Sequence, residues 1–125
     1  MQWILVGIGG ALGSLLRFFL QARIQAAAGG QFPWGTLSVN IAGSAVIGAL
    51  AAALDSSGGP QANLRAFAMV GILGGFTTFS SFSYENVALL RAGEIRLALT
   101  YVAASNILGI AAAVVCYFGV RAALR

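Results

Sequence analysis

The sequence contains no histidine, no lysine, a single cysteine and only three acidic residues in 125 positions. Without histidine it lacks the commonest metal ligand and general base, and it has neither a nucleophile–base pair nor a phosphate-binding loop. Cys116 lies within an apolar run, cannot form an internal disulfide, and is interpreted as a small hydrophobic residue. These absences argue against enzymatic activity and against a histidine-based metal site.

Charge is scarce and apolar sequence abundant. Charged residues make up 8% of the chain, hydrophobic residues 59%, and the mean hydropathy is +0.89, far from the composition of soluble domains. Four apolar stretches of about the length that crosses a bilayer occupy approximately residues 3–22, 35–54, 66–90 and 97–119. We therefore predict an all-α membrane protein, residues 1–125 forming a single transmembrane domain of four helices.

The net charge of +4 comes from seven arginines scattered over the loops and span ends. Nucleic-acid binding needs a clustered basic surface, so we expect no nucleic-acid partner. Four spans place Arg65, Arg121 and Arg125 on one side of the membrane and Arg23, Arg91 and Arg96 on the other, with Arg17 slightly inside the first span.

Orientation in the membrane normally follows an excess of Lys and Arg on the cytoplasmic side, and here the two sides are nearly balanced. The balance predicts insertion in both orientations and an antiparallel, dual-topology homodimer with a self-complementary interface. A fixed orientation, set by the insertion machinery or by a weak local bias, remains the alternative.

Small residues recur at the spacing of helix contacts, as in Gly9 and Gly13, and in Gly71 and Gly75. In lipid, apolar side chains gain little by leaving the acyl chains for one another, so close backbone approach across small residues drives helix association. We interpret these glycines as packing positions.

The third span is unusual in both length and content. As a continuous helix, residues 64–90 would extend about 40 Å, beyond the hydrocarbon core of about 30 Å. The stretch "GGFTTF" from Gly74 to Phe79 combines glycines with β-branched residues, which are poor helix formers. We predict that the helix breaks here, and such breaks persist in membranes only when buried in protein or lining a cavity or ion site.

Neutral polar side chains gather near mid-membrane. Thr36 and Asn40 share one helix face, Tyr101 and Ser105 share another, and Phe79 and Phe82 lie along one face after the expected break. Amides and hydroxyls donate hydrogen bonds and phenyl rings present a positive edge, so the group replaces an anion's water without a fixed charge that would trap it. This composition favours anion passage over catalysis; the alternative is that the side chains only bond helices together.

Two charged residues lie within or near the spans. Arg17 either snorkels to the interface or faces an aqueous vestibule, where it would concentrate anions. Glu85 is the only carboxylate within a span and a functional candidate for that reason. Because it repels anions, we expect it at a wet mouth or paired with an arginine.

Four stretches together resemble the bacterial fluoride channels of the Fluc type, also called CrcB: "GGALGSLLRF", "WGTLSVNIAGS", "GGFTTFSSFS" and "YVAASNILG". The resemblance covers essentially the whole chain. It implies a passive, fluoride-selective channel in the bacterial inner membrane that exports cytoplasmic fluoride down its electrochemical gradient. It also implies a dual-topology antiparallel homodimer with two pores.

The resemblance also assigns roles to single positions. It implies that Asn40, Phe79 and Phe82 line the ion path, that Thr36, Tyr101 and Ser105 continue it, with Ser80 and Ser83 as weaker candidates, and that Arg17 lies toward the vestibule. It implies further a structural Na⁺ on the dimer axis, held by the backbone carbonyls of Gly74 and Thr77 from both subunits.

Two other functions would fit four short spans. A small multidrug-type, proton-coupled exporter requires a carboxylate deep in a span, and Glu85 in the third span is the only candidate. A non-transporting membrane assembly subunit would use every polar group to hold helices together.

Overall fold

The computed structural model describes all 125 residues and contains helices only. Four helical stretches are long and apolar enough to cross a membrane: Gln2–Ala28, Trp34–Ser56, Ala62–Arg91 and Ile95–Ala123. The prediction of four spanning helices in an all-α protein is confirmed. The first, α1 (Gln2–Ala28), extends six residues beyond its predicted end, because no helix breaker occurs before Gly29, which ends it with a φ of 68°.

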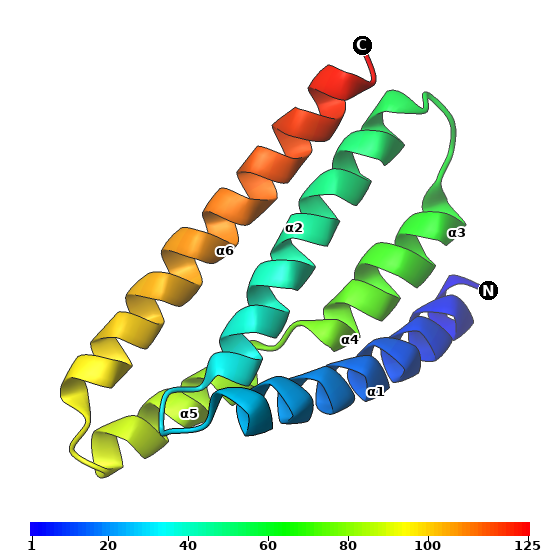
Figure 1. The fold of residues 1–125 in the computed structure, drawn as a ribbon. Helices are drawn as coiled ribbons and strands as arrows, with labels where there is room; N and C mark the ends of the chain where they lie inside the picture. Colours follow the sequence, from blue (N-terminus) through cyan, green and yellow to red (C-terminus); the bar gives the residue numbers. More distant parts are fainter.

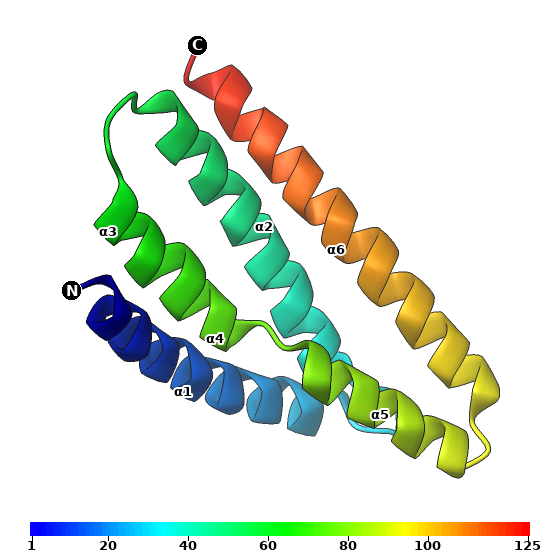
Figure 2. The same ribbon diagram turned by 180° about the vertical axis from the view of Figure 1, so that it is seen from behind.

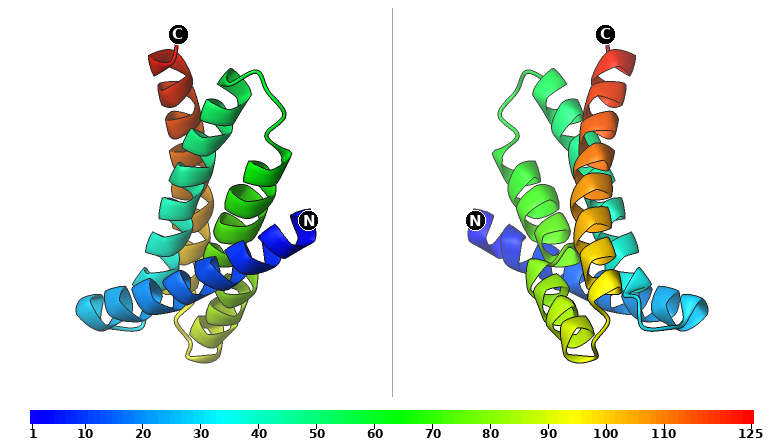
Figure 3. Two further views of the ribbon diagram at one scale, coloured as in Figure 1. Left: turned by 90° about the vertical axis from the view of Figure 1, so that its right-hand side faces the viewer. Right: turned by 90° about the vertical axis from the view of Figure 1, so that its left-hand side faces the viewer.

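The helices form one bundle in which the first is strongly inclined to the others. Helices α2 (Trp34–Ser56) and α6 (Ile95–Ala123) pack side by side along their length (Figure 1). The opposite view shows the first half of the third span between α2 and α1 (Figure 2), and the side views show how steeply α1 crosses it (Figure 3). Helix α2 carries more buried residues than any other and forms the centre of the bundle.

The third span is broken, as predicted from its length. Its first half runs through α3 (Ala62–Leu64), a π-helical segment η1 (Arg65–Leu73) and α4 (Gly74–Phe76), and its second half is α5 (Phe79–Arg91). Between them, Thr77 (φ −92°, ψ 149°) and Thr78 (φ −147°, ψ 127°) are extended. The π-helical segment was not expected from the sequence.

The break lies within the predicted stretch Gly74–Phe79, at its two threonines, while its two glycines stay helical. Gly74 remains helical, with φ −63° and ψ −38°, and Gly75 lies within α4. A Cβ added to Gly75 would overlap the Gly10 carbonyl of α1, and one added to Gly13 would overlap the Ile72 carbonyl. The glycines therefore serve the crossing of α1 over the third span, and the β-branched threonines take the extended conformation.

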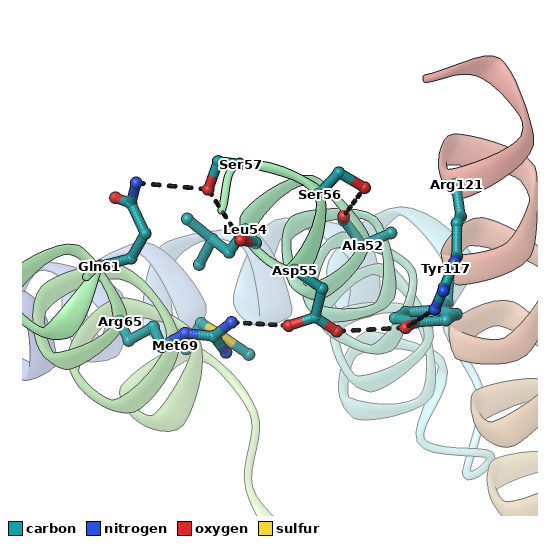
Figure 4. A network of polar contacts seen from close by, with 10 residues as sticks. All are labelled: Ala52, Leu54, Asp55, Ser56, Ser57, Gln61, Arg65, Met69, Tyr117 and Arg121. Atoms are coloured by element: carbon teal, nitrogen blue, oxygen red, sulfur yellow. Dashed lines mark hydrogen bonds and ion pairs between the residues drawn. The ribbon is translucent and has the colours of Figure 1, made fainter. Parts of the chain in front are cut away.

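The membrane end that holds the α2–α3 loop and the C-terminus is tied by a polar network (Figure 4). Asp55 at the end of α2 forms an ion pair with Arg65 at 2.7 Å and accepts a hydrogen bond from the Tyr117 hydroxyl of α6 at 3.1 Å. Arg121 donates to that same hydroxyl at 2.9 Å. The network joins α2, η1 and α6, and it fixes the start of the third span relative to the centre of the bundle.

Candidate anion pathway

Asn40 of α2 holds the broken backbone of the third span. Its amide Nδ2 donates to the Thr78 carbonyl at 3.2 Å, and its Oδ1 accepts from the Thr78 N–H at 3.0 Å. Unpaired backbone groups are costly in a membrane, so this two-point contact offsets the loss of helical bonding at Thr78. One of the two Nδ2 hydrogens remains for another acceptor.

A pocket of about 300 Å³ opens beside this contact, between α2, the break, α5 and α6. Four of the sequence-predicted site residues line it, and so does Thr77 of the break. The four residues are Asn40, Phe79, Phe82 and Ser105. The structure thus brings together side chains from three helices that lie far apart in the sequence.

The two phenylalanines lie together but differ in exposure. Their ring centroids are 5.5 Å apart with an interplanar angle of 42°. Phe82 is buried, at 9% exposure, and also contacts the Tyr101 ring at 4.9 Å between centroids. Phe79 is 78% exposed in the single chain. One ring is therefore fixed by the bundle, whereas the other projects from it at the rim of the pocket.

The Ser105 hydroxyl of α6 is buried in the wall of the same pocket and has no hydrogen-bond partner. A serine in a helix usually bonds to the carbonyl four residues earlier, as Ser83 does to Phe79 at 3.0 Å. An unpaired buried hydroxyl is a donor that remains available to a ligand in the pocket.

Ser80 and Ser83, the weaker candidates, lie on the exposed side of α5. The Ser80 hydroxyl lies 3.1 Å from that of Thr78, and Thr78 in turn caps α5 by accepting from the Ser81 N–H. Neither serine lines a pocket of the single chain, so any contact with an anion requires another surface to cover this side of α5.

A second, wider pocket of about 500 Å³ lies on the other side of the break and contains Arg17. Arg17 Nε donates to the Gly75 carbonyl at 3.1 Å. Gly75 is one of the last residues of α4, where carbonyls lack helical partners and the helix dipole is negative. Arg17 therefore does more than snorkel: it caps the broken helix from within the pocket wall.

Glu85 also lines the wider pocket, but no arginine pairs with it. Its Oε1 accepts from the Thr36 hydroxyl at 2.6 Å, and its Oε2 accepts from the Tyr101 hydroxyl at 2.7 Å. The arginine pairing expected as one alternative is therefore absent. Thr36 and Tyr101, predicted as free donors along a path, direct their hydroxyl protons to this carboxylate.

Sequence reasoning missed the glutamines of α1. Gln21 donates to the Thr36 hydroxyl oxygen at 2.5 Å and approaches Glu85 Oε1 at 3.4 Å.

Gln25 bonds to the Phe32 carbonyl at 3.1 Å and to the Gly35 N–H at 3.1 Å, and so fixes the loop before α2. The spacing of Ser14, Arg17, Gln21 and Gln25 along one helix face was a readable signal.

The break also leaves two carbonyls free. Neither the Gly74 nor the Thr77 carbonyl accepts a hydrogen bond, because the Thr78 N–H bonds to Asn40 and the Ser81 N–H bonds to the Thr78 hydroxyl. Gly74 is exposed and Thr77 is half-buried. Carbonyl oxygens without hydrogen-bond donors are the type of ligand that Na⁺ takes at broken helices in membrane proteins.

Comparison with known proteins identifies the family. The family described as CrcB-like protein, Camphor Resistance (CrcB), matches residues 4–119. The chain belongs to the CrcB family. Its four spanning helices and this membership make it a multi-pass integral membrane protein.

Curated relatives are similar over most of their length. Two proteins named "Fluoride-specific ion channel FluC", from two strains of Thermus thermophilus, are 51% and 50% identical over 109 and 116 residues. These alignments cover 87% and 93% of this chain and 86% and 91% of the relatives. A protein of the same name from Rhizobium meliloti is 47% identical over 102 residues, 82% of each chain.

Proposed function

We propose that this protein is a fluoride-selective channel that carries the ion passively and catalyses no reaction. The observation that carries the proposal is the pocket beside the broken third span, which is lined by Asn40, Phe82 and the unpaired Ser105 hydroxyl. The chain that forms it is about half identical to proteins named as fluoride channels. Its donors are neutral amides, hydroxyls and ring edges. Such groups replace the water of a small anion without the fixed charge that would hold it too tightly.

The direction of transport follows from the membrane potential. Hydrogen fluoride crosses lipid as a neutral acid and ionises in a less acidic cytosol. An inside-negative potential then favours exit of the anion by about 2.3 kcal/mol per 100 mV. A passive pore in the bacterial inner membrane is therefore sufficient for export, provided that it excludes chloride.

The pathway is completed in this proposal by a second copy of the chain. Phe79 is 78% exposed at the pocket rim, and Ser80 and Ser83 lie on the uncovered side of α5. A two-fold partner placed there would enclose Phe79 and turn an open groove into a closed path. The near balance of arginines between the two membrane sides supports an antiparallel arrangement with dual topology.

A structural Na⁺ at the dimer axis is the third part of the proposal. The free carbonyls of Gly74 and Thr77 supply two oxygens per chain, and two antiparallel chains would supply four. The ion would neutralise the carbonyl dipoles left by the break and hold the two copies together.

Reconstitution in liposomes tests the function directly. Liposomes that contain the purified protein are loaded with fluoride or with chloride, and fluoride, chloride and proton movements are followed with electrodes and dyes. Passive fluoride efflux without chloride efflux supports the channel. Drug-driven proton movement would support the exporter, and no movement at all would support an assembly subunit.

Single-cysteine labelling tests the topology. In a Cys116→Ala background, Ser57→Cys and Ala92→Cys place one thiol in each of the loops at opposite ends of the bundle. A membrane-impermeant maleimide applied to intact cells is expected to label about half of each variant, since half of the chains would present either loop outward. Full labelling of one variant and none of the other would contradict dual topology.

A further inference from the structure

One face of α1 is polar over the second half of the helix, although the helix is otherwise largely apolar. Ser14, Arg17, Gln21 and Gln25 follow one another at intervals of three or four residues and so share a face. Ser14 and Arg17 reach the Gly75 carbonyl at the break. Of the four residues, only Gln21 contacts Glu85, the carboxylate of the wider pocket, and the Thr36 hydroxyl beside it.

Gln21 lies at the centre of a closed set of hydrogen bonds. Its Nε2 donates to Thr36 Oγ1 at 2.5 Å and lies 3.4 Å from Glu85 Oε1. Thr36 Oγ1 donates its only proton to the same Glu85 oxygen at 2.6 Å. The three groups therefore form a triangle, which fixes the Thr36 hydroxyl rotor in one direction and gives Glu85 Oε1 two donors.

We propose that Gln21 is a positioning residue that holds the Glu85 carboxylate and the Thr36 hydroxyl in one arrangement in the pocket wall. The inference rests on the proposed channel function and deepens it. Gln21 makes no contact with the anion in this proposal and acts through the two groups that it fixes.

Holding Glu85 in one orientation matters because of where its negative charge lies. Glu85 lines the wider pocket together with Arg17. In this proposal the wider pocket is the vestibule of the path, and an unshielded carboxylate there repels an anion. Tyr101 occupies Oε2 from the buried side, while Thr36 and Gln21 occupy Oε1 from α2 and α1. Without Gln21, one acceptor site on Oε1 is open to the pocket and the Thr36 hydroxyl oxygen loses its donor, so two donors hold the carboxylate in place of three.

The test uses Gln21→Met, which keeps the length and volume of the side chain and removes both donors. We expect fluoride flux per reconstituted dimer to fall about tenfold, the size that a hydrogen bond to a charged group supports. The control is Gln61→Met, the same replacement at a residue before the third span whose side-chain amide bonds only to Ser57, at 3.3 Å. Its flux is expected to equal that of the unaltered protein.

A second pair of variants separates positioning from general stability. In a Glu85→Gln background no carboxylate remains to be held, so adding Gln21→Met is expected to change flux less than about twofold. An equal tenfold loss in both backgrounds would overturn the inference, as would unchanged flux in Gln21→Met alone. If Gln21→Met fails to assemble, Gln21→Ala is compared in the same two backgrounds with the same criteria.

The outcomes also separate this inference from the proposed function. An unaltered protein that moves no fluoride would refute the channel and the positioning role together. An unaltered protein that conducts fluoride, combined with a Gln21→Met variant that conducts equally well, would leave the channel standing and remove only the role of Gln21.

Discussion

The side-chain amide of Asn40 binds both backbone groups of Thr78, the carbonyl at 3.2 Å and the N–H at 3.0 Å. One side chain of α2 thus replaces the helical hydrogen bonds that the third span gives up at its break. The contact also sets the position of the pocket, because Asn40, Thr78 and Phe79 all line it. A residue predicted as an anion donor is therefore also what holds the break in place.

The first prediction concerns this contact. Asn40→Leu leaves the N–H and carbonyl of Thr78 without partners, at about 1–3 kcal/mol for each unsatisfied group. We expect a lower melting temperature in detergent and loss of fluoride flux. Asn106→Leu is the matched control, since Asn106 bonds only to the Val102 carbonyl of its own helix, and its melting temperature should be nearly unchanged. A stable Asn40→Leu protein would show that the amide does not support the break.

The second prediction separates the two phenyl rings by their burial. Phe79→Leu removes an exposed ring and should lower fluoride flux without changing the stability of the folded chain. Phe82→Leu should lower flux and also destabilise the protein by about 1 kcal/mol, because its ring packs on Tyr101. Flux assays and thermal unfolding on both variants check this. If Phe79→Leu weakens self-association of the protein and leaves its flux unchanged, that ring is a packing residue.

The third prediction concerns the crossing of α1 over the third span. A Cβ at Gly13 would overlap the Ile72 carbonyl, and overpacking of this kind typically costs about 1–3 kcal/mol. Gly13→Ala should therefore lower the melting temperature. Gly7→Ala, on the same helix, meets nothing within 4 Å and should have no such effect. Equal melting temperatures for the two variants would contradict the packing role of Gly13.

The sequence predicted the break within Gly74–Phe79 but not which residues of that stretch are extended. The length of residues 64–90 alone required a shorter helix. Whether Gly74-Gly75 or Thr77-Thr78 would unwind depends on what packs against them, and the close approach of Gly10 to Gly75 is a contact between distant segments. No local propensity contains that information. The extended threonines agree with the weak helix propensity of β-branched residues.

The sequence predicted that several polar residues would lie close together, but it did not predict their hydrogen-bond partners. The spacing of Thr36 and Asn40 placed both on one face of α2, and both indeed face the third span. Their partners differ, however: Asn40 binds backbone at Thr78, whereas Thr36 binds the Glu85 carboxylate. The crossing of α1 brings Gln21 next to Thr36 and Glu85. The spacing along α1 indicates a polar face, but it does not indicate which helix that face meets.

The last prediction concerns sodium. If the carbonyls of Gly74 and Thr77 from two chains hold Na⁺, the ion binds only the assembled fold and stabilises it by mass action. Protein prepared throughout in N-methyl-D-glucamine should melt at a lower temperature than protein in sodium, and the melting temperature should rise with sodium concentration until the site is full. The comparison is made at equal ionic strength, so that screening of exposed pairs such as Asp55 with Arg65 is matched. A melting temperature that is the same in both cations at every concentration would exclude a stabilising sodium site.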